Sequence, residues 1–108
     1  EIRCRKDVEQ MFRSMKKGTQ ERVVVLALNA RNEVLGKKVV AVGSLNKAVV
    51  EPRDIFSWAL GRRAAGIILV HNHPSGDLRP SKADNRFTER IKEGGDLLGV
   101  ELIDHVIV

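Results

Sequence analysis

The chain has 108 residues, 43% of them hydrophobic and 31% charged, which indicates one folded domain with a modest core and excludes an intrinsically disordered protein. The formal net charge of +5 raises the question of nucleic acid, but the basic residues are scattered and few aromatic residues are available for base stacking, so a solvated surface is favoured. No apolar run approaches membrane-spanning length, no secretory signal pattern is present, and the lone Cys4 excludes an intramolecular disulfide, which together fit a cytoplasmic setting.

The first predicted element is an amphipathic helix. Positions 8, 11, 12 and 15 are apolar and repeat at i, i+3, i+4 and i+7, the spacing of one helical face. Asp7 suits its N-cap and Gly18 its end. Core packing then accounts for Met11 and Met15.

Two strands are predicted next. The β-branched run 22–28 is typical of a buried strand. After a turn at 29–32, residues 33–43 predict the hairpin partner, with a bulge at Gly36. A short further strand is expected around Lys47 to Val50.

The second half of the chain predicts helices alternating with strands. Pro52 suits the first turn of a helix that continues to about Ala65, and residues 66–70 predict a buried strand. Residues 72–80 are rich in proline and glycine and predict a loop, followed by a helix from Ser81 to about Leu98 and a last strand over 100–108. This order predicts an α/β fold with a mixed sheet flanked by helices.

Four polar residues gather around the loop: His71, His73, Ser81 and Asp84. Residues i and i+2 of a strand share a face, so the two histidines aim at one point if the extended geometry continues, while Asn72 points away. Asp84 falls in the first turn of the next helix, whose side chains lean back toward the N-terminus. Two imidazoles and a carboxylate are good zinc donors, and three protein ligands leave one position for water, as in catalytic sites.

Simpler explanations exist for each residue. Ser81 to Asp84 also matches a capping box, and two histidines at a strand end can be structural. Neither explains why all four residues occur together, so a metal site is favoured. His105, on an apolar strand, is interpreted as a core or sheet-edge histidine that Asp104 and the backbone satisfy.

Hydrolysis at such a site also needs a carboxylate that takes up a proton and passes it to the leaving group. The candidates are Glu21, Glu33, Glu51 and Asp54. Glu21 lies where the first helix gives way to the first strand, and its simplest role is that of a solvated loop residue. Spacing alone does not choose between Glu21 and Glu51.

The string His71-x-His73-Pro74, followed after six residues by Ser81-x-x-Asp84, resembles the motif of the JAMM (MPN+) metalloproteases. The fuller strings over 71–76, 80–84 and 104–108 are similar to the RadC-type branch of that family. The resemblance covers essentially the whole chain. It implies one JAMM/MPN domain over residues 1–108 with a three-layer, cytidine-deaminase-like architecture, without the helix-hairpin-helix region that RadC-type proteins usually carry at the N-terminus.

The resemblance also implies a function. The expected activity is that of a zinc-dependent hydrolase of amide bonds in a peptide or protein, with one zinc ion per chain held by His71, His73 and Asp84. Ser81 is expected to hydrogen-bond the developing oxyanion. The family's general-base glutamate sits after a first helix, at the start of the first strand, and this position is best matched by Glu21. Asn72 replaces the Ser or Thr usual in eukaryotic deubiquitinating relatives, which indicates a bacterial protein and argues against ubiquitin as substrate.

Two other functions stay open at this point. A nucleic-acid-associated module is suggested by the net charge and by the DNA-repair label attached to the family, and binding to duplex DNA that weakens steeply with salt would mark it. A non-catalytic scaffold is the other, since relatives with degenerate motifs work this way. The complete motif of this chain argues against the scaffold.

Overall fold

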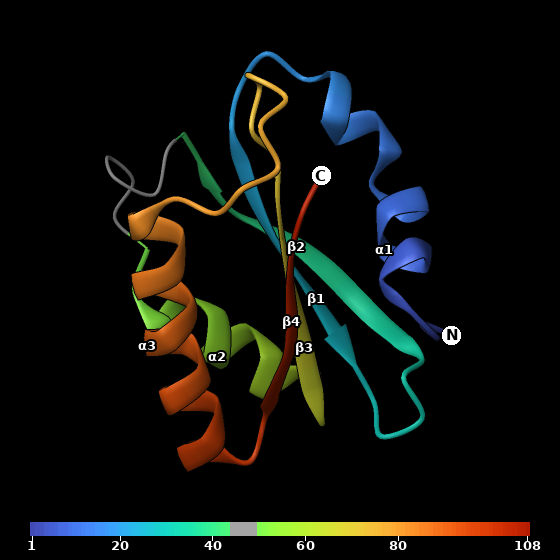
Figure 1. The fold of residues 1–108 in the computed structure, drawn as a ribbon. Coiled ribbons are helices and arrows are strands. Elements are labelled where there is room, and N and C mark those ends of the chain that lie inside the picture. The colour runs from blue at the N-terminus through green and yellow to red at the C-terminus, as the bar shows by residue number, and fades with distance from the viewer. Residues whose placement is uncertain (44–49) are drawn as a thin grey trace.

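The computed structural model describes residues 1–43 and 50–108, which form a four-stranded sheet with helices on both faces (Figure 1). In chain order the elements are α1 (Arg5–Met11), the 3-10 helix η1 (Arg13–Lys17), β1 (Arg22–Leu28), β2 (Val34–Val42), α2 (Pro52–Gly61), β3 (Gly66–His71), α3 (Lys82–Leu98) and β4 (Glu101–Ile107). The short strand expected around Lys47 to Val50 falls on residues 44–49, outside the described part, except for Val50, which is buried but not in a strand.

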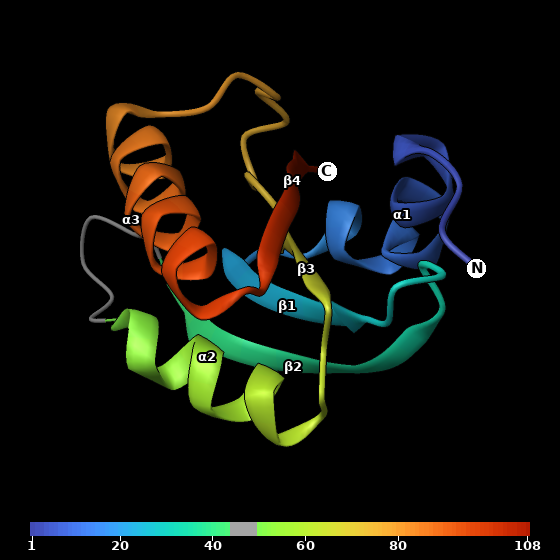
Figure 2. The ribbon, with the colours of Figure 1, turned by 90° about the horizontal axis from the view of Figure 1, so that it is seen from below.

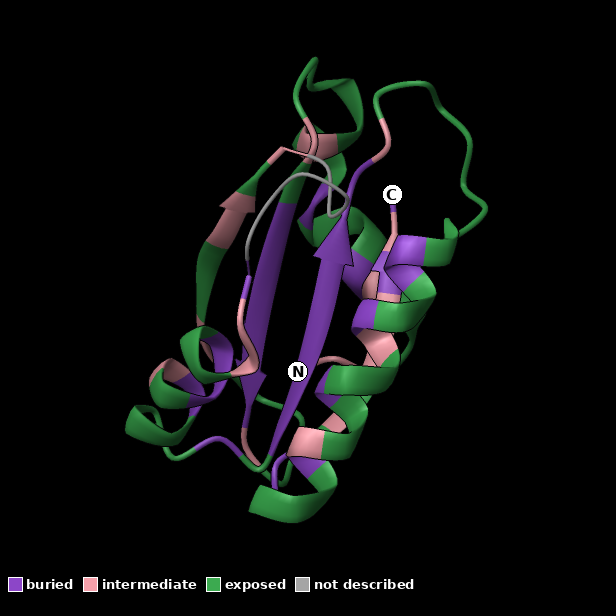
Figure 3. Ribbon diagram, turned by 90° about the vertical axis from the view of Figure 1, so that its left-hand side faces the viewer, coloured by how far each residue is buried: buried purple, intermediate pink, exposed green. Residues whose placement is uncertain are grey.

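The sheet has the strand order β2-β1-β3-β4. β1 pairs antiparallel with both β2 and β3, whereas β3 and β4 are parallel and are joined by the crossover helix α3. The predicted mixed sheet is therefore confirmed. β1 and β3 are buried along almost their whole length because they are central strands covered on both faces (Figure 3).

Two hydrophobic clusters separate three layers (Figure 2). Alternate residues of β1 enter opposite clusters, because successive side chains of a strand point to opposite faces. Val25 and Ala27 pack with α2 and α3, while Val24 and Leu26 pack with α1. Among the described residues, no helix combines the length and apolar composition needed to cross a bilayer.

The N-terminal helix differs from the prediction. It begins after Cys4, and the Asp7 carboxylate reaches back to accept hydrogen bonds from the main-chain N–H groups of Arg3 and Cys4, at 2.7 and 3.3 Å. The chain then tightens into η1, so the apolar stripe does not continue as one helical face. Met11 is 41% exposed and Met15 is half-buried. The prediction of Asp7 as N-cap, and of Met11 in the core, was wrong.

The hairpin and the last crossover agree more closely with the predictions from the sequence. β2 skips one residue opposite β1 at Leu35, beside Gly36 where a bulge was predicted, and another at Val40. α3 ends at Gly99, which adopts the left-handed conformation with φ 75°. Gly95 lets the start of β4 pass close to α3, because a Cβ there would collide with the carbonyl oxygen of Val100.

Candidate metal centre

The two histidines leave the end of β3 on one side of the strand. His71 is its last residue, pairs with Val23 of β1 and Ile107 of β4, and is 1% exposed. His73 follows, and the two rings meet edge to face with centroids 4.8 Å apart. The side chain of Asn72 goes to the other side, as the alternation of the strand predicts.

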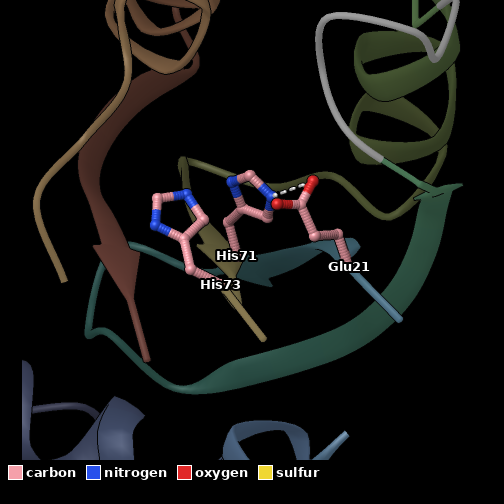
Figure 4. A group of neighbouring side chains, drawn as sticks. All are labelled: Glu21, His71 and His73. Carbon is pink, nitrogen blue, oxygen red and sulfur yellow. Dashed lines mark ion pairs between the residues drawn. The ribbon is translucent and has the colours of Figure 1, made fainter. Parts of the chain in front are cut away.

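Glu21 joins the histidines from a distant part of the sequence. The antiparallel register places Val23 opposite His71, so the residue just before β1 lies beside the end of β3. Glu21 Oε2 is 3.8 Å from His71 Nε2, and the carboxylate turns toward the ring (Figure 4). One donor atom each from Glu21, His71 and His73 lie within 4.8 Å of one another, the separation that ligands of one metal ion can have.

The start of α3 supplies a second carboxylate. Ser81 Oγ accepts a hydrogen bond from the Asp84 N–H at 3.0 Å, and Asp84 Oδ2 accepts one from the Ser81 N–H at 2.8 Å, which is a complete capping box. Asp84 also lies 3.1 Å from His71 Nδ1 and 3.0 Å from His73 Nε2. Ser81 and Asp84 thus cap the helix, and Asp84 in addition contacts both rings.

A main-chain carbonyl orients His73. Its Nδ1 donates to the carbonyl oxygen of Asp77 at 2.7 Å. In the neutral ring, Nε2 then carries the lone pair, which is how metal-binding histidines are usually held. Nε2 faces Asp84 Oδ2 at 3.0 Å, so either a proton or a cation must stand between these two atoms.

Several polar atoms of the centre are buried and have no hydrogen-bond partner in the part of the chain that the structure describes. They include Glu21 Oε2 and both ring nitrogens of His71. His71 Nδ1 lies 3.1 Å from Asp84 Oδ1, but the two groups are not oriented for a hydrogen bond. Buried polar atoms are nearly always paired in folded proteins, and an unpaired one costs roughly 1–3 kcal/mol. A metal ion would satisfy one of the two His71 nitrogens and would lie within reach of Glu21 Oε2, so the residues fit a metal.

The protonation states also suit a metal. Burial lowers the pKa of His71 below its usual value, although nearby carboxylates oppose the shift. Burial works against ionisation of Asp84, but hydrogen bonds from Ser81 and, to a smaller extent, the interactions with His71 and His73 outweigh it and lower the pKa of Asp84. Neutral imidazole and ionised carboxylate are the forms that bind zinc.

The centre opens to solvent through a cleft of about 500 Å³. One wall is the loop between β3 and α3. The lining residues are Glu21, His71, His73, Ser75, Asp77, Arg79, Pro80, Ser81 and Asp84.

The other candidate bases lie elsewhere. Glu51 precedes α2 and pairs with Arg90 at 3.4 Å, Asp54 accepts a hydrogen bond from the Glu51 N–H, and Glu33 accepts one from Asn29. None of them lines the cleft. The fold therefore brings Glu21, and not Glu51, to the histidines.

His105 has different partners from those predicted. It lies on β4 with its ring stacked on that of His71, centroids 6.2 Å apart. Its Nδ1 donates to Thr88 Oγ1 at 2.6 Å, because the Thr88 proton goes to the Asp84 carbonyl. Asp104 binds Arg5 and reaches only the main-chain N–H of His105, while His105 Nε2 is buried without a partner. The prediction that Asp104 and the backbone satisfy this ring was wrong.

Sequence reasoning missed Asp77 and Thr88. Asp77 contributes its main-chain carbonyl, which no side-chain pattern can mark. Thr88 lies four residues after Asp84, and this spacing, at which a threonine hydroxyl reaches a helix carbonyl, was the available signal.

Known proteins resemble the whole chain. The model of the family described as the RadC-like JAB domain matches residues 2–108. A UPF0758 protein of Halalkalibacterium halodurans is 47% identical over 108 residues, which are 99% of this chain and 47% of that protein. UPF0758 proteins of Bacillus licheniformis (51% identical, 83% of this chain and 40% of that protein) and Methanosarcina mazei (44%, 91% and 43%) are also similar. The chain spans less than half the length of these relatives, whose names state no activity.

Proposed function

Because the chain belongs to the RadC-like JAB domain family, we propose that it is a zinc-dependent hydrolase that cleaves an amide bond of a peptide or protein substrate. The observation that carries this proposal is the set of buried, unpartnered donor atoms of Glu21 and His71, next to His73 and Asp84, in an open cleft.

We assign His71, His73 and Asp84 as the zinc ligands. Two imidazoles and one carboxylate are a common ligand set of catalytic zinc, and zinc, when bound, supplies the Lewis acidity that ionises water near neutral pH. The Asp77 carbonyl fixes the tautomer of His73, and the capping box fixes the carboxylate of Asp84 at the start of α3. Both supports involve main-chain groups, of the loop before α3 and of the start of α3.

We assign Glu21 as the general base. Its carboxylate lines the cleft beside His71, and Oε2 accepts no hydrogen bond from any described residue. A carboxylate in this position takes a proton from the attacking water and delivers it to the departing amine. Glu21 also belongs to the group of donors close enough to share an ion, so the assignment as base rather than ligand needs a direct test.

Ser81 is suited to stabilise the oxyanion. Its oxygen accepts the Asp84 N–H bond, which leaves the hydroxyl proton free to be donated into the cleft. A donor placed where negative charge develops lowers the barrier electrostatically, without a covalent step.

The lining of the cleft favours an amide substrate over nucleic acid. It holds three carboxylates, those of Glu21, Asp77 and Asp84, and its one guanidinium, that of Arg79, is paired with Asp77 at 2.9 Å. None of the described lining residues is a lysine, and the one arginine is already paired, whereas nucleic-acid sites place several free Lys and Arg side chains against the phosphates.

The test compares zinc content with hydrolysis of a library of short peptides and isopeptides. We expect wild-type protein to hold one zinc and to hydrolyse some members, His73→Ala to lose both, and Glu21→Gln to keep zinc but lose hydrolysis. Glu51→Gln, a carboxylate outside the cleft, is the control and should change neither. Loss of zinc in Glu21→Gln would make Glu21 a ligand, and a zinc-loaded wild type that hydrolyses nothing would favour a scaffold.

A further inference from the structure

Asn72 lies between the two histidines in sequence but faces the opposite side of β3. It is 1% exposed, and its amide uses every donor it has. Oδ1 accepts a hydrogen bond from the Arg22 N–H at 2.7 Å, and Nδ2 donates to the carbonyl oxygens of Gln20 at 2.9 Å and Met15 at 3.0 Å. A buried amide with this many main-chain partners fixes the backbone that it binds.

These bonds bracket Glu21. Gln20 and Arg22 are its immediate neighbours in the chain, so one side chain holds the backbone on both sides of the proposed base. A hydrogen bond from the Gly43 N–H to the Glu21 carbonyl oxygen also connects Glu21 to the residue that follows β2. Within residues 1–43 and 50–108 the Glu21 Oε2 atom has no hydrogen-bond partner, so among these residues its position depends on where the backbone is held.

We propose that Asn72 is a positioning residue, which sets the Glu21 carboxylate against the metal centre from the far side of β3. The inference rests on the proposed function, since it gives Glu21 its role there. The alternation of the strand makes the arrangement work: His71 and His73 face the ion, and the residue between them holds the base. The two histidines and the proposed base are therefore positioned by the same short piece of backbone, residues 71–73. Displacements of about 1 Å in such groups cost large factors in rate.

The chemistry of the amide is specific. In two of its three hydrogen bonds the amide donates to a carbonyl oxygen. The substitution Asn72→Asp would therefore place a carboxylate oxygen against the carbonyl oxygens of Gln20 and Met15, while the hydrogen bond from the Arg22 N–H would remain. Asn72→Ala removes all three bonds without adding charge. A matched control exists at the other end of β1, where the Asn29 amide also holds a turn through Arg31 and Glu33, away from the cleft.

The experiment is a titration with Co²⁺, whose visible spectrum reports the surroundings of the ion and needs no substrate. The proteins are wild type, Asn72→Ala, Glu21→Gln, the double variant and Asn29→Ala, with circular dichroism confirming that each is folded. We expect every protein to bind one Co²⁺, Glu21→Gln and Asn72→Ala to shift the same absorption bands, and the double variant to match Glu21→Gln. Dissociation constants of the double variant and Glu21→Gln should agree within about twofold, because coupled residues are not additive. Asn29→Ala should match wild type.

Three results would overturn the proposal. One is a wild-type spectrum in Asn72→Ala, and another is an unchanged spectrum in Glu21→Gln. The third is an effect of Asn72→Ala that persists in full when Glu21 is already Gln, because Asn72 would then act on the histidines. If Asn72→Ala does not fold, Asn72→Asp and Asn72→Ser take its place in the same comparison. If the domain hydrolyses no substrate, the proposed function is contradicted, but the spectroscopic test of Asn72 remains valid.

Discussion

The carbonyl oxygen of Asp77 accepts a hydrogen bond from Nδ1 of His73, so an exposed loop determines which ring nitrogen faces the metal centre. The Asp77 carboxylate in turn accepts bonds from the Arg79 main-chain N–H at 2.9 Å and from its guanidinium at 2.9 and 3.0 Å. Hydrogen bonds from Arg79 lower the pKa of Asp77 to about 2, so this carboxylate stays ionised at working pH and can keep accepting these bonds. Loop structure and metal affinity should therefore be coupled.

Asp77→Ala should weaken zinc binding. The substitution keeps the carbonyl but removes the side-chain bonds that hold the turn, so His73 loses part of its orientation. Changes in groups that orient a metal ligand typically cost 10–100-fold in affinity, and we expect about tenfold here. Competition with a chelating dye measures it. Arg86→Ala, an exposed site on α3, is the control, and equal affinity in the two variants would disprove the coupling.

The two roles of Ser81 can be separated by two substitutions. Ser81→Ala removes both the cap and the hydroxyl, and losing an N-cap costs about 1 kcal/mol in the free energy of unfolding. Ser81→Gly removes the hydroxyl as well, but glycine is an acceptable N-cap and should cost only about 0.3 kcal/mol. We expect both variants to lose hydrolysis equally while differing in urea midpoint. Activity that follows stability instead would make Ser81 structural only.

Zinc should raise the thermal stability of the domain. An ion that binds only the folded state adds about 2.7 kcal/mol at about 100 times its Kd, which corresponds to roughly 10 °C in Tm for a domain of this size. Magnesium at the same concentration should have little effect, because it prefers oxygen ligands over the imidazoles of His71 and His73. Scanning calorimetry with and without each ion measures this. A Tm that zinc leaves unchanged, or that falls, would contradict the proposed ligand set.

Local patterns predicted the elements that hold the histidines. The apolar run before His71 predicted β3, and the proline-rich loop and Ser81 predicted where α3 begins. The approach of Glu21 to His71 followed only from the family resemblance and not from local pattern, because it depends on the long-range pairing of β1 with β3. The 3-10 segment after α1 escaped prediction for a similar reason. Its Met15 carbonyl is held by Asn72, a tertiary contact that overrides the helical stripe.

The metal-free domain should lose stability as the pH falls below neutral. Burial, with the charge of His71 adding to it, lowers the pKa of His105 to about 4, against an ordinary value of 6.5. Asp84 and Asp104 face the same ring and oppose the shift, while His73 adds to it. Between these pH values the unfolded chain binds more protons than the folded one. The stabilisation is thus complete above pH 6.5 and is lost as the pH falls toward 4, by up to roughly 3 kcal/mol.

Urea unfolding of wild type and His105→Asn from pH 8 to pH 4.5 checks this expectation. Asparagine can keep the donation to Thr88 but has no titrating group, so the variant should show a shallower loss. Some loss should persist, because burial also lowers the pKa of His71. Asp84 and Asp104 have lowered pKa values and contribute mainly below this range. Identical pH profiles for the two proteins would show that His105 does not titrate in this way.

Gly95→Ala should destabilise the domain strongly, and Gly61→Ala should not. A Cβ at Gly95 meets the carbonyl oxygen of Val100, a backbone atom tied to the same helix by the Val100 N–H bond to the Gly95 carbonyl at 2.9 Å. Neither group can move without separating β4 from α3, so we expect a loss of about 3 kcal/mol.

Gly61 provides the matched control because it ends α2 with nothing within 4 Å of the added Cβ. Alanine there should raise the free energy of unfolding by about 0.5 kcal/mol, through better helix propensity and a less flexible unfolded chain. Both substitutions add the same methyl group to a helix, so the difference between their urea midpoints isolates the contact with Val100. A Gly95→Ala protein as stable as Gly61→Ala would mean that α3 and β4 do not pack this closely. The contact between Thr88 and His105, which spans the same two elements, would then lose its basis.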